Sequence, residues 1–267
     1  METKRLDVLL VELGLTESRA KAQALIKAGN VLVDGKPAVK PGQSCFEQQK
    51  IEITGDFCPY VSRGGLKLEK ALHDFGVDPT GFVCSDSGAS TGGFTDCLLQ
   101  QGASKVFAID VGTDQLVGKI RNDPRVVVME QTNIRYVTPD QIGEPLDLSV
   151  VDVSFISLQL VLPTIKALLK PDRGQVLCLI KPQFEAGKAN LGKKGVVKDR
   201  RVHKQVLDEF ISFVHALGFT VLGLTYSPVC GPEGNIEFLG HLSLENRESI
   251  AVNSAAIVAA AHDNLKV

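Results

Sequence analysis

The sequence has few aromatic residues, no overall positive charge and no long apolar run. Its 267 residues include no tryptophan and only three tyrosines, so base stacking is expected to contribute little to any binding of nucleic acid. The formal net charge is −2, so such a partner has to be recognised through local basic patches. No run of about 18 apolar residues occurs, and no membrane-spanning helix is expected.

The six cysteines are scattered and match no metal or redox motif. No C-x-x-C pair occurs, and no cysteine and histidine stand at the spacing of metal ligands, so no metal site is expected. Three cysteines lie in apolar runs, where cysteine behaves as a small hydrophobe. This usage is typical of the reducing cytosol and predicts a cytoplasmic protein. The N-terminal stretch METKRLDVLLVELG is interrupted by Asp7 and Glu12, which is not typical of a secretion signal.

Residues 1–54 predict a small α+β module. Apolar residues recur at helical spacing from residue 4, and a second helix is expected from Thr16 to a stop signal at Gly29. The stretch VLVDGKPAV, residues 31–39, predicts a hairpin. A linker rich in glycine is predicted over residues 55–64.

Residues 65–267 alternate apolar strands with amphipathic helices. Strands are predicted at 82–86, 105–110, 125–129, 146–152, 174–181, 219–226 and 236–243. Helices are predicted at 65–76, 93–101, 157–169, 199–217 and 246–264. This alternation indicates an α/β fold whose mostly parallel sheet is covered on both faces. The last two strands have no helix between them and predict an antiparallel hairpin at the edge of the sheet.

The stretch SDSGASTGGF, residues 85–94, lies between the first of these strands and a helix, where many α/β proteins hold a cofactor. It lacks the lysine of a phosphate-binding P-loop and the G-x-G-x-x-G spacing of a dinucleotide site. Asp86 also argues against a pyrophosphate, because a carboxylate repels it. A strand-to-helix turn in a domain that binds no cofactor is the alternative.

An acid at this position suits a cationic cofactor such as S-adenosylmethionine, which carries a sulfonium and an ammonium and no phosphate. Asp110, which lies 24 residues further on at the end of the next strand, is placed to accept hydrogen bonds from ribose hydroxyls. Asn133 either lines an adenine pocket or is an ordinary turn residue. The candidate cofactor-binding residues are Asp86, Ser87, Gly88, Ala89, Ser90, Thr91, Gly92, Gly93, Asp110, Val111, Asn133 and Asp152.

Four charged residues stand where an apolar core would not accommodate them. Asp152 and Lys181 end apolar strands, Glu237 lies in the last strand and Lys67 begins a helix. Each alone is readily explained as a charge at a strand edge. Together they predict a polar crevice at the carboxyl ends of the strands, where open α/β sheets bind ligands.

The motifs SRGG-x-KL, D-x-GASTGGF, TN-x-R, DVSFISL, IKPQFE and IEFL together resemble the TlyA-type family, the hemolysin A-like ribosomal RNA 2′-O-methyltransferases. The resemblance spans nearly the whole chain and includes an FtsJ-like methyltransferase domain with a Rossmann-like sheet. The stretch KRLDVLLVELGLTESRAKAQALIKAGNVLVDGK resembles the RNA-binding domain of a small-subunit ribosomal protein. The resemblance implies methylation of cytidine 2′-hydroxyls in ribosomal RNA or ribosomal subunits.

The resemblance also implies a catalytic tetrad of Lys67, Asp152, Lys181 and Glu237. A ribose hydroxyl is a weak nucleophile, and a lysine whose pKa is lowered can serve as its base. We assign that role to Lys181 and substrate positioning to Lys67, although the reverse assignment stays open. Asp152 is expected to orient the ammonium groups, and Glu237 to complete the charge network. No metal is required.

Two basic patches are candidates for RNA contact. The first lies in the N-terminal module, which has eight Lys or Arg against seven Asp or Glu, and a solvated helix face explains it equally well. The second, over residues 187–204, follows Lys181 and is expected to rim the active site as a mobile cationic loop. Arg135 is a further candidate for phosphate contact. The predicted RNA-binding residues are Arg5, Arg19, Lys21, Lys27, Arg63, Lys188, Lys193, Lys194, Lys198, Arg200 and Arg201.

Two other classes of function are compatible with the resemblance. The hemolysin label suggests a membrane-lytic protein, which the absence of a predicted span and secretion signal disfavours. A non-catalytic RNA-binding factor in ribosome assembly is the other, and the intact glycine loop and tetrad disfavour it.

Overall fold

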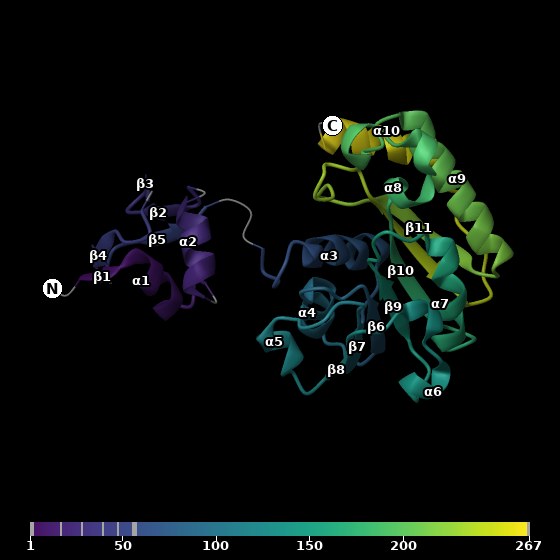
Figure 1. Ribbon diagram of the computed structural model, residues 1–267, viewed down its shortest axis with the longest axis horizontal. Coiled ribbons are helices and arrows are strands. Elements are labelled where there is room, and N and C mark those ends of the chain that lie inside the picture. Colours follow the sequence, from purple (N-terminus) through teal and green to yellow (C-terminus); the bar gives the residue numbers. More distant parts are fainter. Residues whose placement is uncertain are drawn as a thin grey trace. The chain divides into compact units, whose positions relative to one another are not determined.

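The computed structural model describes residues 3–16, 18–27, 29–38, 40–46, 48–54 and 58–265. Backbone contacts divide the chain into two compact units, Met1–Pro59 and Tyr60–Val267 (Figure 1). The division falls inside the predicted linker, of which residues 55–57 lie outside the described part of the chain. Each unit has a hydrophobic core of its own.

The N-terminal unit packs two helices against short strands. Its elements are β1 (Thr3–Arg5), α1 (Leu6–Glu12), α2 (Arg19–Lys27), β2 (Val31–Val33), β3 (Lys36–Pro37), β4 (Ser44–Phe46) and β5 (Ile51–Ile53). β2 pairs with β3 in the predicted hairpin and with β5 on its other side, while β1 pairs with β4. Leu6, Leu9 and Leu10 of α1 pack on Ala22 and Ile26 of α2, which forms the core.

The second unit is built on a seven-stranded sheet. Its strands are β6 (Val83–Ser87), β7 (Lys105–Ile109), β8 (Val126–Met129), β9 (Leu148–Val151), β10 (Gln175–Ile180), β11 (Thr220–Tyr226) and β12 (Phe238–Ser243). The strand order is β11-β12-β10-β9-β6-β7-β8, and β12 runs antiparallel between β10 and β11. The predicted Rossmann-like sheet with an antiparallel edge hairpin is confirmed.

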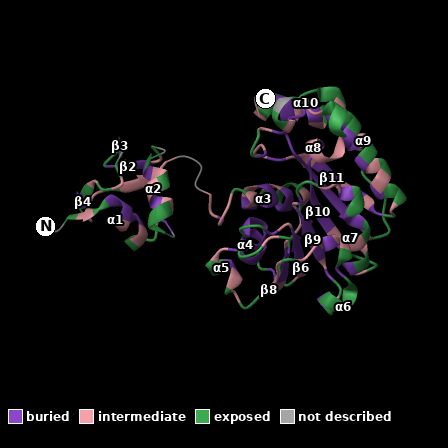
Figure 2. Cartoon of the chain, viewed as in Figure 1, coloured by how far each residue is buried: buried purple, intermediate pink, exposed green. Residues whose placement is uncertain are grey.

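Helices cover both faces of this sheet, which is why its central strands are buried (Figures 1 and 2). The helices are α3 (Gly64–Phe75), α4 (Gly93–Gln100), α5 (Gly118–Arg121), α6 (Pro139–Ile142), α7 (Leu162–Leu168), α8 (Pro182–Glu185), α9 (Arg200–Ala216) and α10 (Ser254–Leu265). In Figure 1, α3 and α4 lie on one side of the sheet, and α7 and α9 lie on the other. Among the described residues, no helix combines the length and the apolarity that a membrane crossing requires.

The strand register places the carboxyl ends of β6, β9 and β10 next to the start of β12, at the same end of the sheet. Ser87 at the end of β6 pairs with Val151 at the end of β9, and Ile180 at the end of β10 pairs with Phe238 at the start of β12. The residues that directly follow β6, β9 and β10, and the residue that precedes β12, therefore lie at the same end of the sheet.

Two predicted helices differ from the structure. The last helix begins at Ser254 rather than at residue 246, because the preceding segment runs along the sheet, where the Ile250 amide donates to the Val221 carbonyl at 3.0 Å. The first helical pattern begins as the strand β1, because residues 3–5 pair with β4 from a distant part of the sequence. Both differences arise from tertiary pairing that overrides local preference.

Candidate active site

The glycine loop between β6 and α4 packs against the end of β9. Gly88 has φ of +89°, and a Cβ at this position would lie 2.5 Å from the Asp152 carbonyl oxygen. A side chain is therefore excluded there both by backbone conformation and by space. The Gly88 and Ala89 amides donate to the Ile109 carbonyl, which fixes the loop to the end of β7 as well.

Asp86 lies fully buried beneath this loop. Its Oδ2 accepts a hydrogen bond from the Thr95 hydroxyl at 2.7 Å, whereas its Oδ1 has no hydrogen-bond partner among the described residues. Burial, together with the nearby negative charge of Asp152, raises the pKa of this carboxyl to about 7, although the hydrogen bond from Thr95 lowers it in part. A buried carboxylate without a cationic partner is costly, so this position favours a ligand that brings positive charge.

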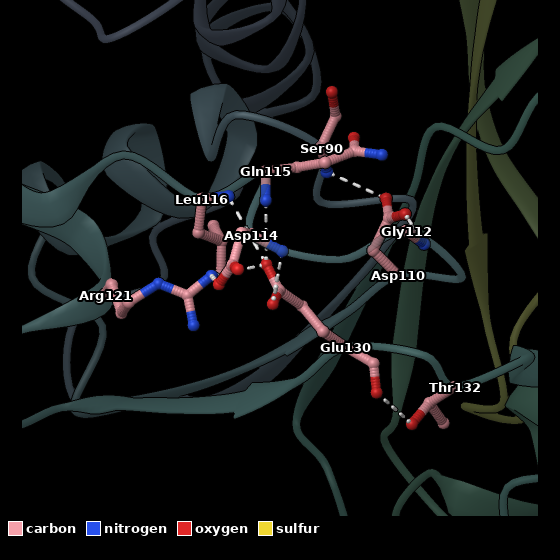
Figure 3. A network of polar contacts seen from close by, with 9 residues as sticks. All are labelled: Ser90, Asp110, Gly112, Asp114, Gln115, Leu116, Arg121, Glu130 and Thr132. Atoms are coloured by element: carbon pink, nitrogen blue, oxygen red, sulfur yellow. Dashed lines mark hydrogen bonds and ion pairs between the residues drawn. The ribbon is translucent and has the colours of Figure 1, made fainter.

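Asp110 directly follows β7 and ties the glycine loop to the next loop (Figure 3). Its Oδ2 accepts from the Ser90 amide at 2.8 Å, and its Oδ1 accepts from the Gly112 amide at 2.7 Å. Each carboxylate oxygen can accept more than one hydrogen bond, so capacity for hydroxyl donors remains.

Glu130 binds the loop that follows Asp110, and its role was not predicted from the sequence. Its carboxylate accepts from the Asp114 and Gln115 amides at 2.9 and 3.1 Å and from Arg121 at 2.6 Å (Figure 3). The hydrogen bond from Arg121 lowers its pKa to about 2. The available signal was its position directly after β8, which matches that of Asp110 after β7.

The four predicted catalytic residues form two ion pairs. Lys67 Nζ lies 2.6 Å from Glu237 Oε2, and Lys181 Nζ lies 2.6 Å from Asp152 Oδ1. Lys181 also donates to the Ser154 hydroxyl at 3.0 Å, a contact that the sequence did not predict. Lys67, Lys181 and Glu237 are buried, so each charge depends on its partner for stabilisation.

Two adjoining cavities bring the loop and the ion pairs together. A cavity of about 280 Å³ is lined by Lys67, Asp152 and the glycine loop, and a cavity of about 930 Å³ is lined by Asp110 and Asp152. Three residues line both cavities, namely Gly88, Ser90 and Asp152. Asp152 therefore faces the cavity that Lys67 lines and also the cavity that Asp110 lines.

Most of the remaining candidate cofactor-binding residues line one of the two cavities. Ala89, Thr91 and Gly93 line the smaller cavity, and Val111 and Asn133 line the larger one. Gly92 caps α4 with φ of +99°, and Ser87 is buried at the end of β6. Asn133 also accepts a hydrogen bond from the Arg135 amide, so it is a turn residue as well as part of the cavity wall.

The basic segment 187–204 lies partly on the rim of the larger cavity. Lys188 lines that cavity, and Lys194 and Lys198 are exposed without an ion pair in the described part of the chain. Arg200 pairs with Asp263 and Arg201 with Asp199, both at 3.0 Å. The side chain of Lys193 lies outside the described residues.

The predicted basic residues elsewhere have different surroundings. Arg63 is exposed and lines the smaller cavity, and Arg135 lies 5.1 Å from the Tyr136 ring. In the N-terminal unit, Arg5 and Arg19 both bind the buried carboxylate of Asp7 while about half of each side chain stays exposed. Lys21 and Lys27 lie on α2, with Lys27 exposed.

The fold is that of a methyltransferase. The FtsJ-like methyltransferase model matches residues 60–244, and the S4 domain model matches residues 4–45. The chain belongs to the FtsJ-like methyltransferase family and carries an S4 domain before the methyltransferase domain.

Several relatives are similar over nearly their whole length. The chain is 48% identical to YqxC of Bacillus subtilis, provisionally named an rRNA methyltransferase, over 98% of this chain and 95% of that protein. It is 42% identical to the 16S/23S rRNA (cytidine-2′-O)-methyltransferase TlyA of Mycobacterium tuberculosis, over 97% and 96%. A solved structure from Streptococcus thermophilus, provisionally designated a hemolysin, has a TM-score of 0.78 at 44% identity and covers all of this chain and 98% of its own.

Proposed function

We infer that this protein uses S-adenosylmethionine to methylate the ribose 2′-hydroxyl of cytidine in ribosomal RNA. The observation that carries this proposal is the pairing of two features at one edge of the sheet. One is the carboxylate of Asp86, which is buried beneath the glycine loop and has no cationic partner among the residues that the structure describes. The other is the two lysine–carboxylate ion pairs. The name of the M. tuberculosis relative supports the cytidine and the 2′-oxygen.

The residues present fit this cofactor. Asp86 places a buried negative charge behind the glycine loop without lining either cavity, and Asp110, which lines the larger cavity, offers acceptors to ribose hydroxyls. Gly88 leaves room for close approach to the backbone. S-adenosylmethionine, when bound, supplies an electrophilic methyl group.

The two lysine pairs are assigned to the acceptor hydroxyl. An ammonium has three donors and no lone pair, so Lys181 can accept a proton from the hydroxyl only after it has released one. Asp152 and Ser154 hold its Nζ in place, and Glu237 holds Lys67 in the wall of the smaller cavity. Most of the rate enhancement is expected from holding the hydroxyl in line with the methyl group.

The choice between the two lysines can be tested by arginine substitution. Arginine keeps the positive charge and the ion pair but does not act as a base. Lys181→Arg is expected to lower kcat by at least about 100-fold, the size of a general-base contribution. Lys67→Arg is expected to retain more activity than Lys181→Arg, and the opposite ranking would assign the base role to Lys67.

Folded ribosomal RNA is expected to be held mainly through its phosphates. Lys188 lines the larger cavity, and Lys194 and Lys198 are exposed further along the same segment. The arginines bound to Asp7 present a second charged surface on the S4 domain. Neutralising phosphates releases counterions, so binding should weaken steeply as salt rises.

The proposal is tested with methyl-labelled S-adenosylmethionine and unmethylated small subunits, large subunits and protein-free rRNA. After digestion to nucleosides, label in 2′-O-methylcytidine is expected, and the labelled substrate identifies the target. Label on a base would contradict the role given to the lysine pairs. No label in any substrate, with cofactor binding intact, would favour a non-catalytic assembly factor.

A further inference from the structure

The catalytic Glu237 is enclosed by a tight turn formed by residues 231–235. The Gly234 amide donates to the Gly231 carbonyl, and the Gly231 amide donates to the Asn235 carbonyl, both at 2.9 Å. A Cβ at Gly231 would lie 2.7 Å from Glu237 Oε1, so the turn closes directly onto the carboxylate that binds Lys67. Movement of this turn therefore reaches the Glu237–Lys67 pair.

The side chain of Asn235 points from this turn to the backbone of the basic segment. Its Oδ1 accepts from the Val197 amide at 3.0 Å, and its Nδ2 donates to the Gly195 carbonyl at 3.2 Å. Asn235 is 4% exposed, so water cannot easily replace these bonds when they are lost. One buried amide thus satisfies two backbone groups of a segment about 40 residues away.

The segment bonded by Asn235 carries two of the unpaired cations. Lys194 lies directly before Gly195, Lys198 lies directly after Val197, and both are exposed. Val197 is 1% exposed and anchors the backbone between them. Lys194 has φ of +63°, a conformation unusual for lysine that must be maintained by its surroundings. The Gly195 amide donates to the Gly192 carbonyl at 3.1 Å and the Gly192 amide donates to the Val196 carbonyl at 3.0 Å, so the bonds to Asn235 add to a turn that also has its own backbone bonds.

We propose that Asn235 is a positioning residue that couples binding of RNA phosphates at Lys194 and Lys198 to the placement of the Glu237–Lys67 pair. This inference rests on the proposed function. Asn235 lies two residues before Glu237 and bonds the backbone between the two lysines, so it fixes the distance between the phosphate-binding cations and the catalytic carboxylate. The basic segment is therefore held near its centre by two hydrogen bonds.

The test compares Asn235→Ala with Asn264→Ala. Asn264 in α10 also donates its side-chain amide to a backbone carbonyl, that of Ala260, but lies outside the site. Dissociation constants are measured for unmethylated ribosomal subunits in the presence of S-adenosylhomocysteine, and separately for S-adenosylmethionine alone. Asn235→Ala is expected to weaken subunit binding roughly tenfold, since two hydrogen bonds are lost, and to leave cofactor affinity unchanged. Asn264→Ala is expected to change neither.

A double-mutant cycle separates coupling from general destabilisation. If Asn235 acts through the two lysines, Asn235→Ala added to a Lys194→Ala and Lys198→Ala background should weaken subunit binding by less than about twofold. Additive effects would overturn the proposal, and so would unchanged subunit affinity in the single variant. If the alanine variant fails to fold, Asn235→Ser decides, since its hydroxyl can satisfy one of the two backbone groups and a smaller loss is expected.

Methylation by the wild-type protein shows whether a negative result rejects only the positioning role of Asn235 or the proposed function itself. Wild-type methylation together with unchanged subunit affinity in both Asn235 variants would reject the positioning role alone. Absence of methylation by the wild type would reject the proposed function, whatever the Asn235 variants do.

Discussion

Asp7 in the N-terminal unit and Asp86 in the methyltransferase unit are both fully buried, yet their surroundings are opposite. Asp7 accepts hydrogen bonds from Arg5, Arg19 and Gln23, and the Arg5 guanidinium contributes most to holding its pKa well below the usual range. Within the described part of the chain Asp86 accepts only from Thr95, and burial raises its pKa to about 7. The described part of the protein supplies a countercharge to Asp7 and none to Asp86, which agrees with the proposed role of Asp86 in binding a cationic cofactor.

The comparison teaches how to distinguish a structural buried acid from a binding residue. Where the chain provides cationic donors to both oxygens, the carboxylate organises the fold. Where one oxygen stays unpaired beneath a loop that accepts no side chain, burial of the charge has a cost that is offset by protonation or by a bound cation. The same substitution at the two positions should therefore have opposite consequences.

The largest expected effect is on cofactor affinity. Asp86→Asn removes the buried negative charge and should weaken binding of S-adenosylmethionine by about 100-fold, the size of a charged hydrogen bond. Asp7→Asn should leave that affinity unchanged. Isothermal titration calorimetry measures both, and equal affinities of the Asp86 variant and the wild type would remove the basis for calling Asp86 a ligand residue.

The second effect is on stability without cofactor. At pH 8, Asp86→Asn should stabilise the methyltransferase unit, because it relieves an uncompensated buried charge, whereas Asp7→Asn should destabilise the N-terminal unit by about 2 kcal/mol. Hydrogen exchange of α3 and α4 reports the first change, and exchange of α1 and α2 reports the second. Loss of protection in α3 and α4 of the Asp86 variant would be the contrary result.

The third effect is the dependence of stability on pH. Asp86 has a raised pKa, so the folded state binds more protons than the unfolded state between pH 3.8 and about 7, and its contribution to stability falls as pH rises through that window. Asp7 has a lowered pKa, so its contribution is present above the ordinary aspartate value of 3.8 and is lost as pH falls below it. Urea unfolding of each aspartate variant against the wild type, at pH 3, 5 and 8, should give differences of these opposite signs.

The smallest expected effect comes from Glu130, which binds the loop that follows Asp110. Glu130→Gln loses the ion pair with Arg121 and should weaken cofactor binding by at most about fivefold, because the pair is partly exposed. Glu144→Gln is the control, since Glu144 pairs with Lys105 at the opposite end of β7. Equal affinities of the two variants would mean that Glu130 does not position Asp110.

The sequence predicted the sheet well because its strands are apolar runs bounded by glycine and proline. It missed β1 and β4, which pair across about 40 residues and have only three residues each. It also predicted a helix over residues 246–253, where pairing of Ile250 with Val221 imposes an extended path. Contacts between distant segments leave no periodic signal in either segment.

In the candidate site, too, side-chain contacts between distant segments could not be predicted from the sequence. Asp86, Asp152 and Lys181 are marked by their place at strand ends. Lys67 pairs with Glu237 rather than with Asp152 because of how distant segments pack. The hydrogen bond from the Val197 amide to Asn235 likewise depends on long-range packing. Arg5 was assigned to RNA from its charge alone, whereas the structure also gives it a buried partner, Asp7.

Asp86 is proposed to receive a cationic cofactor, and counting the protons released on binding tests this proposal. At pH 6, Asp86 in the cofactor-free protein should be mostly protonated, because its pKa is about 7, and binding of the cation should displace that proton. Calorimetric titration with S-adenosylmethionine in buffers of different ionisation enthalpy measures the number released. We expect close to one proton from the wild type and none from Asp86→Asn, whereas equal release from both proteins, or none from either, would contradict the account.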